Sequence, residues 1–510
     1  MSDATGPVLA ADGKPLKASL NRALRREKMR ALMLIAPLLL FVLVTFIAPI
    51  ADMLFRSVEN NIVGETIPRT VQVLRTWDPA EDELPSKAAF QALYTDLVFA
   101  EERKIHTRLG TRLNYELTGM SSLFRKSGRS VGRFDTDAYT DAFVDLDPAW
   151  EDPATWASVA ATPGLTNTAS AYATWVDVVT ENGDDPSEEE PWDVLFTALY
   201  TDLTASQNSF EDPLLSTAQS AAAAFENVSL IEQFEDADKD WLDPEVWQTI
   251  QTYAASYTPG YFLNSADLQL TPEGIESRPD NERIYILLFQ RTLFMSLVIT
   301  LSCILLGYPV AWLLANLPAR KANVLMILVL LPFWTSLLVR TSAWKVLLQQ
   351  QGVINDTLVW AGIVDEAGRL ALINNQTGTI IAMTHILLPF MILTLYSVMK
   401  TIPPTYLRAA KSLGATNWTA FWRVYFPNSV PGIGAGSILV FILAIGYYIT
   451  PELVGGTQGV FISNRIAYHI SSSLNWGLAA ALGTILLVAV LALYWVYDRI
   501  VGIDNVKLGG

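Results

Sequence analysis

Six stretches of this 510-residue chain are each long and apolar enough to cross a lipid bilayer. A spanning helix needs about 20 mostly apolar residues, and its backbone polar groups must be satisfied within the segment. The sequence therefore predicts an all-α integral membrane protein with six transmembrane helices. The apolar stretches are 32–54, 293–315, 323–344, 377–398, 430–450 and 478–497.

The first apolar stretch has two interpretations. Four cations precede it, Arg25, Arg26, Lys28 and Arg30, as they would in a signal peptide. However, about 30 residues come before the run, the run is long, and no clean A-x-A cleavage site follows it. We therefore expect an uncleaved first transmembrane helix at 32–55, behind an N-terminal tail of residues 1–31.

The orientation follows from the positive charges near the helix ends, which favour the cytoplasmic side. Cations gather before the first span and, with six alternating spans, in every loop that would lie on the same side. We therefore expect both termini, including the tail 504–510, to be cytoplasmic and residues 56–283 to be extracytoplasmic. The cations concerned are Lys14, Lys17, Arg22, Arg25, Arg26, Lys28, Arg30, Arg320, Lys321, Lys400, Arg408, Lys411, Arg423, Arg499 and Lys507.

Charge is divided unequally along the chain. The whole chain carries a net charge of −16 although 51% of it is hydrophobic. Residues 56–283 hold 41 acidic and 15 basic side chains, a net charge of −26, which leaves +10 for the rest. Such a division predicts an acidic, water-soluble block inserted into a basic membrane chain. The only cysteine, Cys303, lies in an apolar run, so no intrachain disulfide is possible.

The acidic block contains an internal repeat. FQALYTDL at 90–97 matches FTALYTDL at 196–203, and WEDPATW at 150–156 matches WLDPEVW at 241–247. In the second motif Asp can cap a helix, Pro suits its first position, and the two tryptophans can pack together. We predict a duplicated helical unit with tryptophans in its core; an aromatic surface for carbohydrate or amine ligands is the alternative. The copies would cover about 70–160 and 175–255.

Motifs of catalysis are absent from the sequence. It has no G-x-x-x-x-G-K-[ST] phosphate loop, no G-x-S-x-G, no H-E-x-x-H and no cysteine pair. The three histidines, His106, His385 and His469, are far apart in the expected topology. We therefore expect neither an enzyme nor a chain that binds a cofactor or metal of its own.

Polar and aromatic side chains near the expected membrane edges are candidates for a solute pathway. His385 lies within the fourth apolar stretch, where an ionisable group is costly unless it is functional or satisfied. Snorkelling to the interface explains Arg340 and Glu452 as well as a solute pathway does, and an interfacial aromatic belt is the alternative for the aromatic residues. The candidates are Trp334, Arg340, Trp344, His385, Tyr447 and Glu452.

The expected cytoplasmic loop 400–429 is unusually specific. Residues 404–413 predict a short amphipathic helix that ends at Gly414, a typical C-cap residue. A second short helix, 416–426, carries four aromatic residues, and Pro427 would stop it before the fifth span. Two such helices can dock a partner in a groove or lie among lipid headgroups.

This loop resembles the EAA loop of binding-protein-dependent ABC importer permeases, whose pattern is E-A-A-x3-G-x9-I-x-L-P. Both alanines, the glycine, the proline and all spacings match, whereas an arginine replaces the glutamate. The resemblance implies a coupling helix that sits in a cleft of a cytoplasmic ATPase subunit. The matched positions are Arg408, Ala409, Ala410, Gly414, Val424, Phe426 and Pro427.

Other stretches resemble the spermidine/putrescine-type permease subunit, among them GYPVAW at 307–312 and TPELVGG at 450–456. The resemblance implies a type I importer fold, a permease core at 284–503 and a location in the bacterial inner membrane. It also implies four kinds of partner: an ABC ATPase dimer that hydrolyses ATP, a second permease, a periplasmic solute-binding protein and the lipid membrane. No nucleic acid is expected.

A membrane receptor is the alternative function, in which the repeat block senses a ligand and the loop signals. It would need no ATPase partner and would carry no solute. If the chain is a permease, we expect the repeat block to cap the periplasmic mouth of the pathway. There it would contact the binding protein or the second permease.

Overall fold

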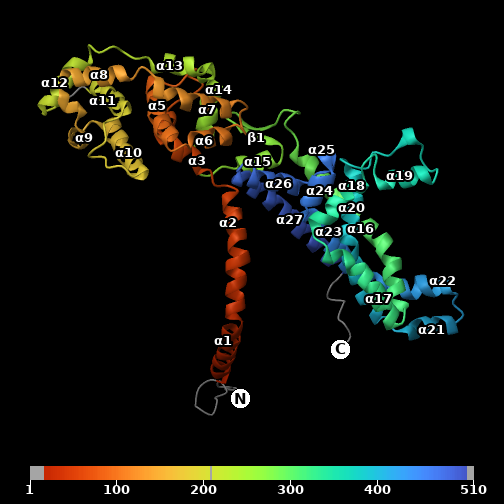
Figure 1. Cartoon of the computed structure of the whole chain (residues 1–510). Coiled ribbons are helices and arrows are strands. Elements are labelled where there is room, and N and C mark those ends of the chain that lie inside the picture. Colours follow the sequence, from red (N-terminus) through yellow and green to blue (C-terminus); the bar gives the residue numbers. More distant parts are fainter. Residues whose placement is uncertain (1–15, 207–208, 502–510) are drawn as a thin grey trace.

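The computed structural model describes residues 16–206 and 209–501 of the chain (Figure 1). They form a helical membrane bundle and a helical block attached to one end of it. Within the described residues the only strands are β1 (Leu268–Thr271) and β2 (Gly274–Ser277), which form one short antiparallel hairpin. The all-α fold class is confirmed. Lys14, Lys507 and the tail 504–510 lie outside the described residues.

Five described helices are long and apolar enough to span a membrane, or six with one bent pair. The first combines α1 (Leu16–Val42), a π-helical turn (Leu43–Ile47) and α2 (Ala48–Arg56). It stands apart from the bundle for most of its length, and none of its apolar window is buried (Figure 1). The other four are α16 (Tyr285–Asn316), α20 (Gln376–Thr401), α23 (Phe426–Gly446) with the turn before it, and α27 (Trp476–Val501).

The prediction of one continuous helix at 323–344 is wrong. The chain forms α17 (Ala319–Leu330), a 3₁₀ turn (Leu331–Trp334) and α18 (Leu337–Leu347), and the two parts meet at 92°. Pro332 lacks the amide hydrogen that a continuing helix would need. The Ser336 side chain then accepts a hydrogen bond from the Val339 amide and so starts a new helix.

Three spans form the centre of the bundle. α16, α20 and α23 pack on one another through a cluster that includes Met295, Ile299, Met383 and Val440, all completely buried. At Gly436 an added Cβ would lie 2.6 Å from the Met391 sulfur. Small residues at such contacts let membrane helices approach closely and so increase their van der Waals contact.

Short helices on both ends of the bundle join the spans. On the side of the helical block they are α19 (Val353–Trp360), a 3₁₀ turn (Glu366–Gly368), α24 (Ile449–Val454), α25 (Gly456–Gly459) and α26 (Ile462–Ser471). On the opposite side they are α21 (Pro404–Ser412), α22 (Asn417–Ala420) and a π-helical turn (Phe421–Tyr425) (Figure 1).

The block between the first two spans is built from short helices around one hydrophobic core. Its helices are α3 (Asn61–Thr66), α4 (Pro68–Leu74), α5 (Lys87–Glu102), α6 (His106–Leu113), α7 (Met120–Ser130), α8 (Asp137–Leu146), α9 (Pro153–Ala160), α10 (Thr166–Asn182), α11 (Asp193–Ala205), α12 (Pro213–Ala222), α13 (Leu230–Ala237), α14 (Pro244–Thr252) and α15 (Gly260–Ser265). Its 3₁₀ turns are Val131–Arg133, Pro148–Glu151 and Lys239–Leu242.

The two W-x-D-P-x-x-W motifs have the same geometry. Asp152 caps α9 through the Ala154 amide, and Asp243 caps α14 through the Glu245 amide. In each copy the second tryptophan donates its indole N–H to the backbone carbonyl of the first at 2.9 Å. All four tryptophans, Trp150, Trp156, Trp241 and Trp247, are completely buried. The prediction that they form the core is confirmed, and the aromatic-surface alternative is wrong.

The repeated F-x-A-L-Y-T-D-L motifs also match in three dimensions. Asp96 on α5 accepts hydrogen bonds from the amide and hydroxyl of Thr70, in the first turn of α4. Asp202 on α11 accepts the same two bonds from Thr168, in the first turn of α10. Each carboxylate therefore caps the start of a neighbouring helix that is distant from it in the sequence. The repeated unit thus includes α4 in one copy and α10 in the other.

The helical block has two lobes, and each lobe combines part of one copy of the repeat with part of the other copy. Phe90 of the first copy packs on Trp247 of the second, and Phe196 of the second packs on Trp156 of the first. One lobe thus combines α4 and α5 with α13 and α14, and the other combines α8 and α9 with α10 and α11 (Figure 1). The first lobe is completed only when the end of the block returns to its beginning.

The two ends of the block are joined next to the membrane bundle. The Asn60 amide donates to the Ser256 carbonyl, and the Thr258 amide donates to the Val58 carbonyl, at 2.8 and 2.9 Å. Glu116 accepts from Arg112, from Arg278 and from the Tyr253 hydroxyl, which lie on three separate segments. An insertion is tolerated when its ends lie close together, and these contacts hold them so.

Candidate functional site

The first candidate site is the loop at the end of the bundle opposite the helical block (Figure 1). α21 is followed, two residues after its last residue, by Gly414, which has the left-handed φ of +88°. The Gly414 amide donates to the Lys411 carbonyl, and the Ala415 amide donates to the Ala410 carbonyl, both at 3.0 Å. This is the Schellman motif, so the predicted helix end at Gly414 is confirmed.

Large apolar side chains on this loop face away from the chain. Leu413 is 90% exposed, Trp418 is 71% exposed and Tyr406 is 50% exposed. Uncovered apolar side chains of this kind fit either a groove on a partner or the lipid headgroups. Of the residues that match the EAA pattern, Arg408, Ala409, Gly414 and Pro427 are exposed, whereas Ala410, Val424 and Phe426 are partly buried. Within the described chain the side chain of Arg408 makes no hydrogen bond or ion pair.

The prediction that Pro427 separates a short helix at 416–426 from the fifth span is wrong. α22, the π-helical turn and α23 form one continuous helical run from Asn417 to Gly446. Pro427 lies in the first turn of α23, directly after the π-helical turn. A π turn already interrupts the usual pattern of backbone hydrogen bonds, so a proline there does not end the helix.

A residue outside the predicted site, Tyr308 on α16, braces the loop against the bundle. Its ring lies 6.2 Å from the Phe421 ring and 5.9 Å from the Phe426 ring, measured between centroids. Its hydroxyl shares a hydrogen bond of 2.9 Å with the Ser429 hydroxyl. The aromatic residues of the loop are therefore connected through one side chain to the central helix of the bundle.

The second candidate site lies toward the block side of the bundle. The Trp344 indole N–H donates to Nδ1 of His385 at 3.0 Å, which leaves the imidazole proton on Nε2. Arg340 lies one turn before Trp344 on α18. Its Nε and Nη1 atoms are buried and have no hydrogen-bond partner in the described chain. Trp344 and His385 are thus in direct contact, whereas Tyr447, at the end of α23, packs on the cluster between the three central spans.

The other two pathway candidates, Trp334 and Glu452, are exposed. Trp334 is 80% exposed at the bend between α17 and α18. Glu452 is exposed on α24 and accepts a 2.6 Å hydrogen bond from the Asn464 side chain. The side-chain amide of Asn464 also donates to the Tyr448 carbonyl, at 2.8 Å, and so holds α26 against the end of α23.

Sequence reasoning missed the polar contacts that position these candidates. The hydroxyls of Thr341 on α18 and Thr450 on α24 are 3.1 Å apart and both residues are completely buried. Asn464 likewise lies in an ordinary stretch of sequence. Thr450 belongs to the stretch 450–456 that resembles other permeases, which was the one available signal.

Comparison with known families agrees with this architecture. Residues 274–502 match the family described as "Binding-protein-dependent transport system inner membrane component". This region contains α16 to α27 and both candidate sites, whereas nearly all of the helical block lies before it.

Curated relatives cover the same part of the chain. The spermidine/putrescine transport system permease protein PotB of Escherichia coli (strain K12) is 36% identical over 220 residues, 42% of this chain and 79% of the relative. PotB of Salmonella typhimurium (strain SL1344) is also 36% identical, over 42% of this chain and 76% of the relative. The inner membrane ABC transporter permease protein YdcU of Escherichia coli (strain K12) is 33% identical, over 48% of this chain and 80% of the relative.

A chain from a solved bacterial alginate ABC transporter overlaps 45% of this chain and 81% of its own length. Its TM-score is 0.38 and its identity to this chain is 19%. The three relatives named above are each over 30% identical to this chain, which covers more than two thirds of each of them. The chain belongs to the family of binding-protein-dependent transport system inner membrane components, the permease subunits of ABC importers.

Proposed function

We propose that this permease forms half of the translocation pathway for a polyamine or a related small cation. Two observations support that solute class: the PotB relatives are spermidine/putrescine permeases, and the core carries motifs that resemble that permease type. We also propose that the second half of the pathway comes from another, similar permease, as the membership of the importer family suggests.

We propose that both termini and the loop 404–427 face the cytoplasm and that the insert, residues 56–283, faces the periplasm. The distribution of cations supports this orientation. A separate ATPase dimer then binds the loop and hydrolyses ATP, and this chain binds no cofactor itself. The observation that carries the proposal is the exposed surface of Leu413 and Trp418 beside a firmly ended α21.

The role of Arg408 follows from its position on this surface. It is exposed, unpaired within the described chain, and stands where the family pattern has a glutamate. A cationic side chain at a docking surface favours a partner with an acidic group opposite it. We expect the ATPase cleft that receives this loop to carry a carboxylate in reach of Arg408.

The insert caps the periplasmic mouth of the pathway and contacts the binding protein or the second permease. Its attachment supports this role, because both of its ends are fixed at the bundle end that also carries Tyr448 and Glu452. Deletion of residues 60–280, with a short Gly/Ser linker, should abolish docking of the binding protein or reduce uptake. Unchanged docking and transport would contradict this role.

Uptake assays test the solute class. Cells or proteoliposomes that contain the complete importer should accumulate labelled spermidine or putrescine in an ATP-dependent manner. Unlabelled amino acids should not compete with this uptake. Accumulation of another solute only would exclude the polyamine class and retain the permease. A ligand-binding signal without flux of any solute would favour a receptor.

A further inference from the structure

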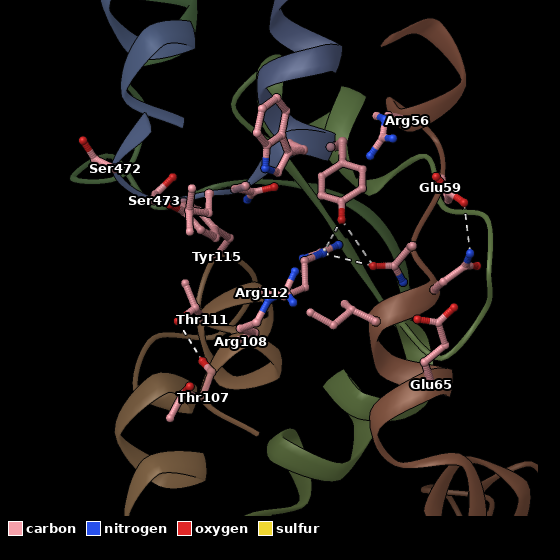
Figure 2. A pocket seen from close by; sticks show the side chains of 18 residues that line it. Arg56, Glu59, Glu65, Thr107, Arg108, Thr111, Arg112, Tyr115, Ser472 and Ser473 are labelled. Atoms are coloured by element: carbon pink, nitrogen blue, oxygen red, sulfur yellow. Dashed lines mark hydrogen bonds between the residues drawn. The ribbon is translucent and has the colours of Figure 1, made fainter. Parts of the chain in front are cut away.

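A pocket of about 580 Å³ lies at the junction between the insert and the membrane bundle (Figure 2). It is bounded by the end of α2, by α3 and α6 of the insert, and by the turn between α26 and α27. Its volume is within the range of small-ligand pockets. None of the residues that line it belongs to the loop 404–427 or to the pathway candidates.

Two buried donors on this pocket have no acceptor. Nη2 of Arg112 and Nδ2 of Asn475 are both inaccessible to solvent and without a hydrogen-bond partner in the described chain. Arg112 is only 5% exposed and Asn475 only 8% exposed. They come from different parts of the fold, α6 of the insert and the turn before α27. Buried donors normally find partners, so this pair indicates an acceptor that the chain does not supply.

The other two nitrogens of Arg112 each have a hydrogen-bond partner. Nη1 is paired with Glu116 at 2.6 Å, and Nε donates to Asn60 and to the Tyr261 hydroxyl. The guanidinium also lies over the Tyr253 and Tyr261 rings, 5.1 and 4.4 Å from their centroids. Its position is therefore fixed, and Nη2 is a preorganised donor.

The charges around the pocket are of both signs. Arg56 and Arg108 add two cations to Arg112, and the side chain of Arg108 has no hydrogen bond or ion pair within the described chain (Figure 2). Glu59 and Glu65 add two carboxylates on the α3 side. Such a lining suits a ligand that carries an oxyanion and an ammonium group, and it suits a simple cation poorly.

The pocket lies where two candidate membrane spans begin or end on the same side. Arg56 is the last residue of the first span, and Trp476 is the first residue of α27. Trp476 is 50% exposed and Leu474 is 61% exposed beside the pocket. Exposed aromatic residues at span ends are typical of the level of lipid headgroups.

We propose that this pocket binds the headgroup of a membrane phospholipid, with its phosphodiester oxygens on Arg112, Arg108 and Asn475. The Glu59 and Glu65 carboxylates accept the ammonium group of an ethanolamine headgroup, so a phosphatidylethanolamine binds more tightly than a phosphatidylglycerol. The bound lipid joins the insert, the first span and α27, and the acyl chains leave past Leu474 and Trp476.

Two variants test the site on the full chain in detergent. Asn475→Asp keeps the side-chain oxygen that caps α27 through the Leu478 amide, but replaces the free donor with a negative charge. Arg108→Gln removes an exposed charge and leaves the fold intact. Arg125→Gln is the matched control, because Arg125 is an exposed cation on α7 outside the pocket. Binding of short-chain phosphatidylethanolamine, short-chain phosphatidylglycerol and inorganic phosphate is measured by native mass spectrometry and by the shift in Tm.

The wild-type chain and Arg125→Gln should bind phosphatidylethanolamine equally, and the two pocket variants should bind it about tenfold or more weakly. Binding of the lipid but not of inorganic phosphate identifies the membrane as the source. Saturable binding of phosphate at the same residues assigns the oxyanion site to a free ion instead and overturns the lipid assignment. Equal lipid binding by all four proteins overturns the site altogether.

Discussion

The ring of Phe90 packs edge-on against Trp247, with 4.8 Å between the ring centroids, although 157 positions separate the two residues. Phe196 and Trp156 form the matching contact in the other lobe, also at 4.8 Å. Since each contact joins one copy of the repeat to the other, neither copy can complete its own core. Each lobe of the insert is therefore built from parts of both copies.

The first prediction concerns this exchange. Phe90→Ala and Phe196→Ala should each lower the unfolding free energy of the insert by about 3–5 kcal/mol, because each removes a completely buried ring. Phe90→Leu and Trp247→Leu should be non-additive by about 0.5–1.5 kcal/mol, the value of an aromatic pair. Thermal melts of the full chain followed by near-ultraviolet circular dichroism measure both effects. Full additivity would contradict the contact between the copies.

The second prediction concerns orientation. Cys303 is buried and is the only cysteine, so Cys303→Ala gives a background without thiols. In that background Ser187→Cys, in an exposed loop of the insert, should react with a membrane-impermeant maleimide in whole cells. Ser412→Cys, at the end of α21, should react only after the membrane is permeabilised. The reverse pattern would invert the assigned orientation.

The third prediction concerns pH. Burial lowers the pKa of His469 to about 4, assisted by the nearby Arg465 charge. The imidazole accepts or donates hydrogen bonds with Tyr285 and Ser473, beside the Tyr115 ring of the insert. Between pH 6.5 and 4 the unfolded chain binds a proton at this residue and the folded chain does not. Stability should therefore fall by up to about 3 kcal/mol as the pH drops through this window.

His469→Gln serves as the reference for that measurement, because glutamine does not titrate. The Tm of the wild-type chain should exceed that of His469→Gln at pH 7.5, and the difference should shrink progressively toward pH 4. A difference that stays constant over this window would show that the proton on His469 does not limit the stability of the junction.

The fourth prediction concerns the brace at Tyr308. Tyr308→Ala removes the ring that contacts Phe421 and Phe426, so motion of the loop should no longer reach α16. Uptake should then fall by about tenfold or more while ATP hydrolysis continues. Tyr308→Phe is the control: it keeps the ring and loses only the hydrogen bond to Ser429, and it should transport nearly normally. Equal uptake by both variants would remove Tyr308 from the coupling route.

Local chemistry was predictable from the sequence. The Asp152 and Asp243 caps, the tryptophan pairs and the Schellman end at Gly414 all depend on residues within six positions of one another. Hydropathy located the spans because a bilayer permits few alternatives to an apolar helix. Hydropathy carries no information on the direction of the backbone, so it could not show the 92° bend after Pro332.

Long-range contacts were not predictable. The motif spacing revealed two copies, but it did not reveal that Phe90 of the first copy would pack on Trp247 of the second. The contacts of Arg112 with Asn60, Glu116 and Tyr261 join segments up to 149 positions apart, and no short pattern marks them. Of the pathway candidates, the sequence supplied the residue types, whereas only the packing of α18 on α20 brought Trp344 against His385.

The fifth prediction concerns Gly414, where α21 ends with φ +88° and an amide that donates to Lys411. Proline cannot adopt this φ and has no amide hydrogen, so Gly414→Pro should destroy the end of the helix. Asparagine tolerates the left-handed conformation, so Gly414→Asn should keep it. A glutamate at Ala410, which is partly buried beside this turn, should disturb the same surface.

The most direct test of the coupling loop is to measure ATP hydrolysis and solute uptake together in proteoliposomes that contain the complete importer. Gly414→Pro should lose the coupling between the two, with uptake reduced by about tenfold or more, whereas Gly414→Asn should remain close to wild type. If Gly414→Pro retains both solute-stimulated ATP hydrolysis and wild-type uptake, this loop is not where ATP-driven motion enters the membrane.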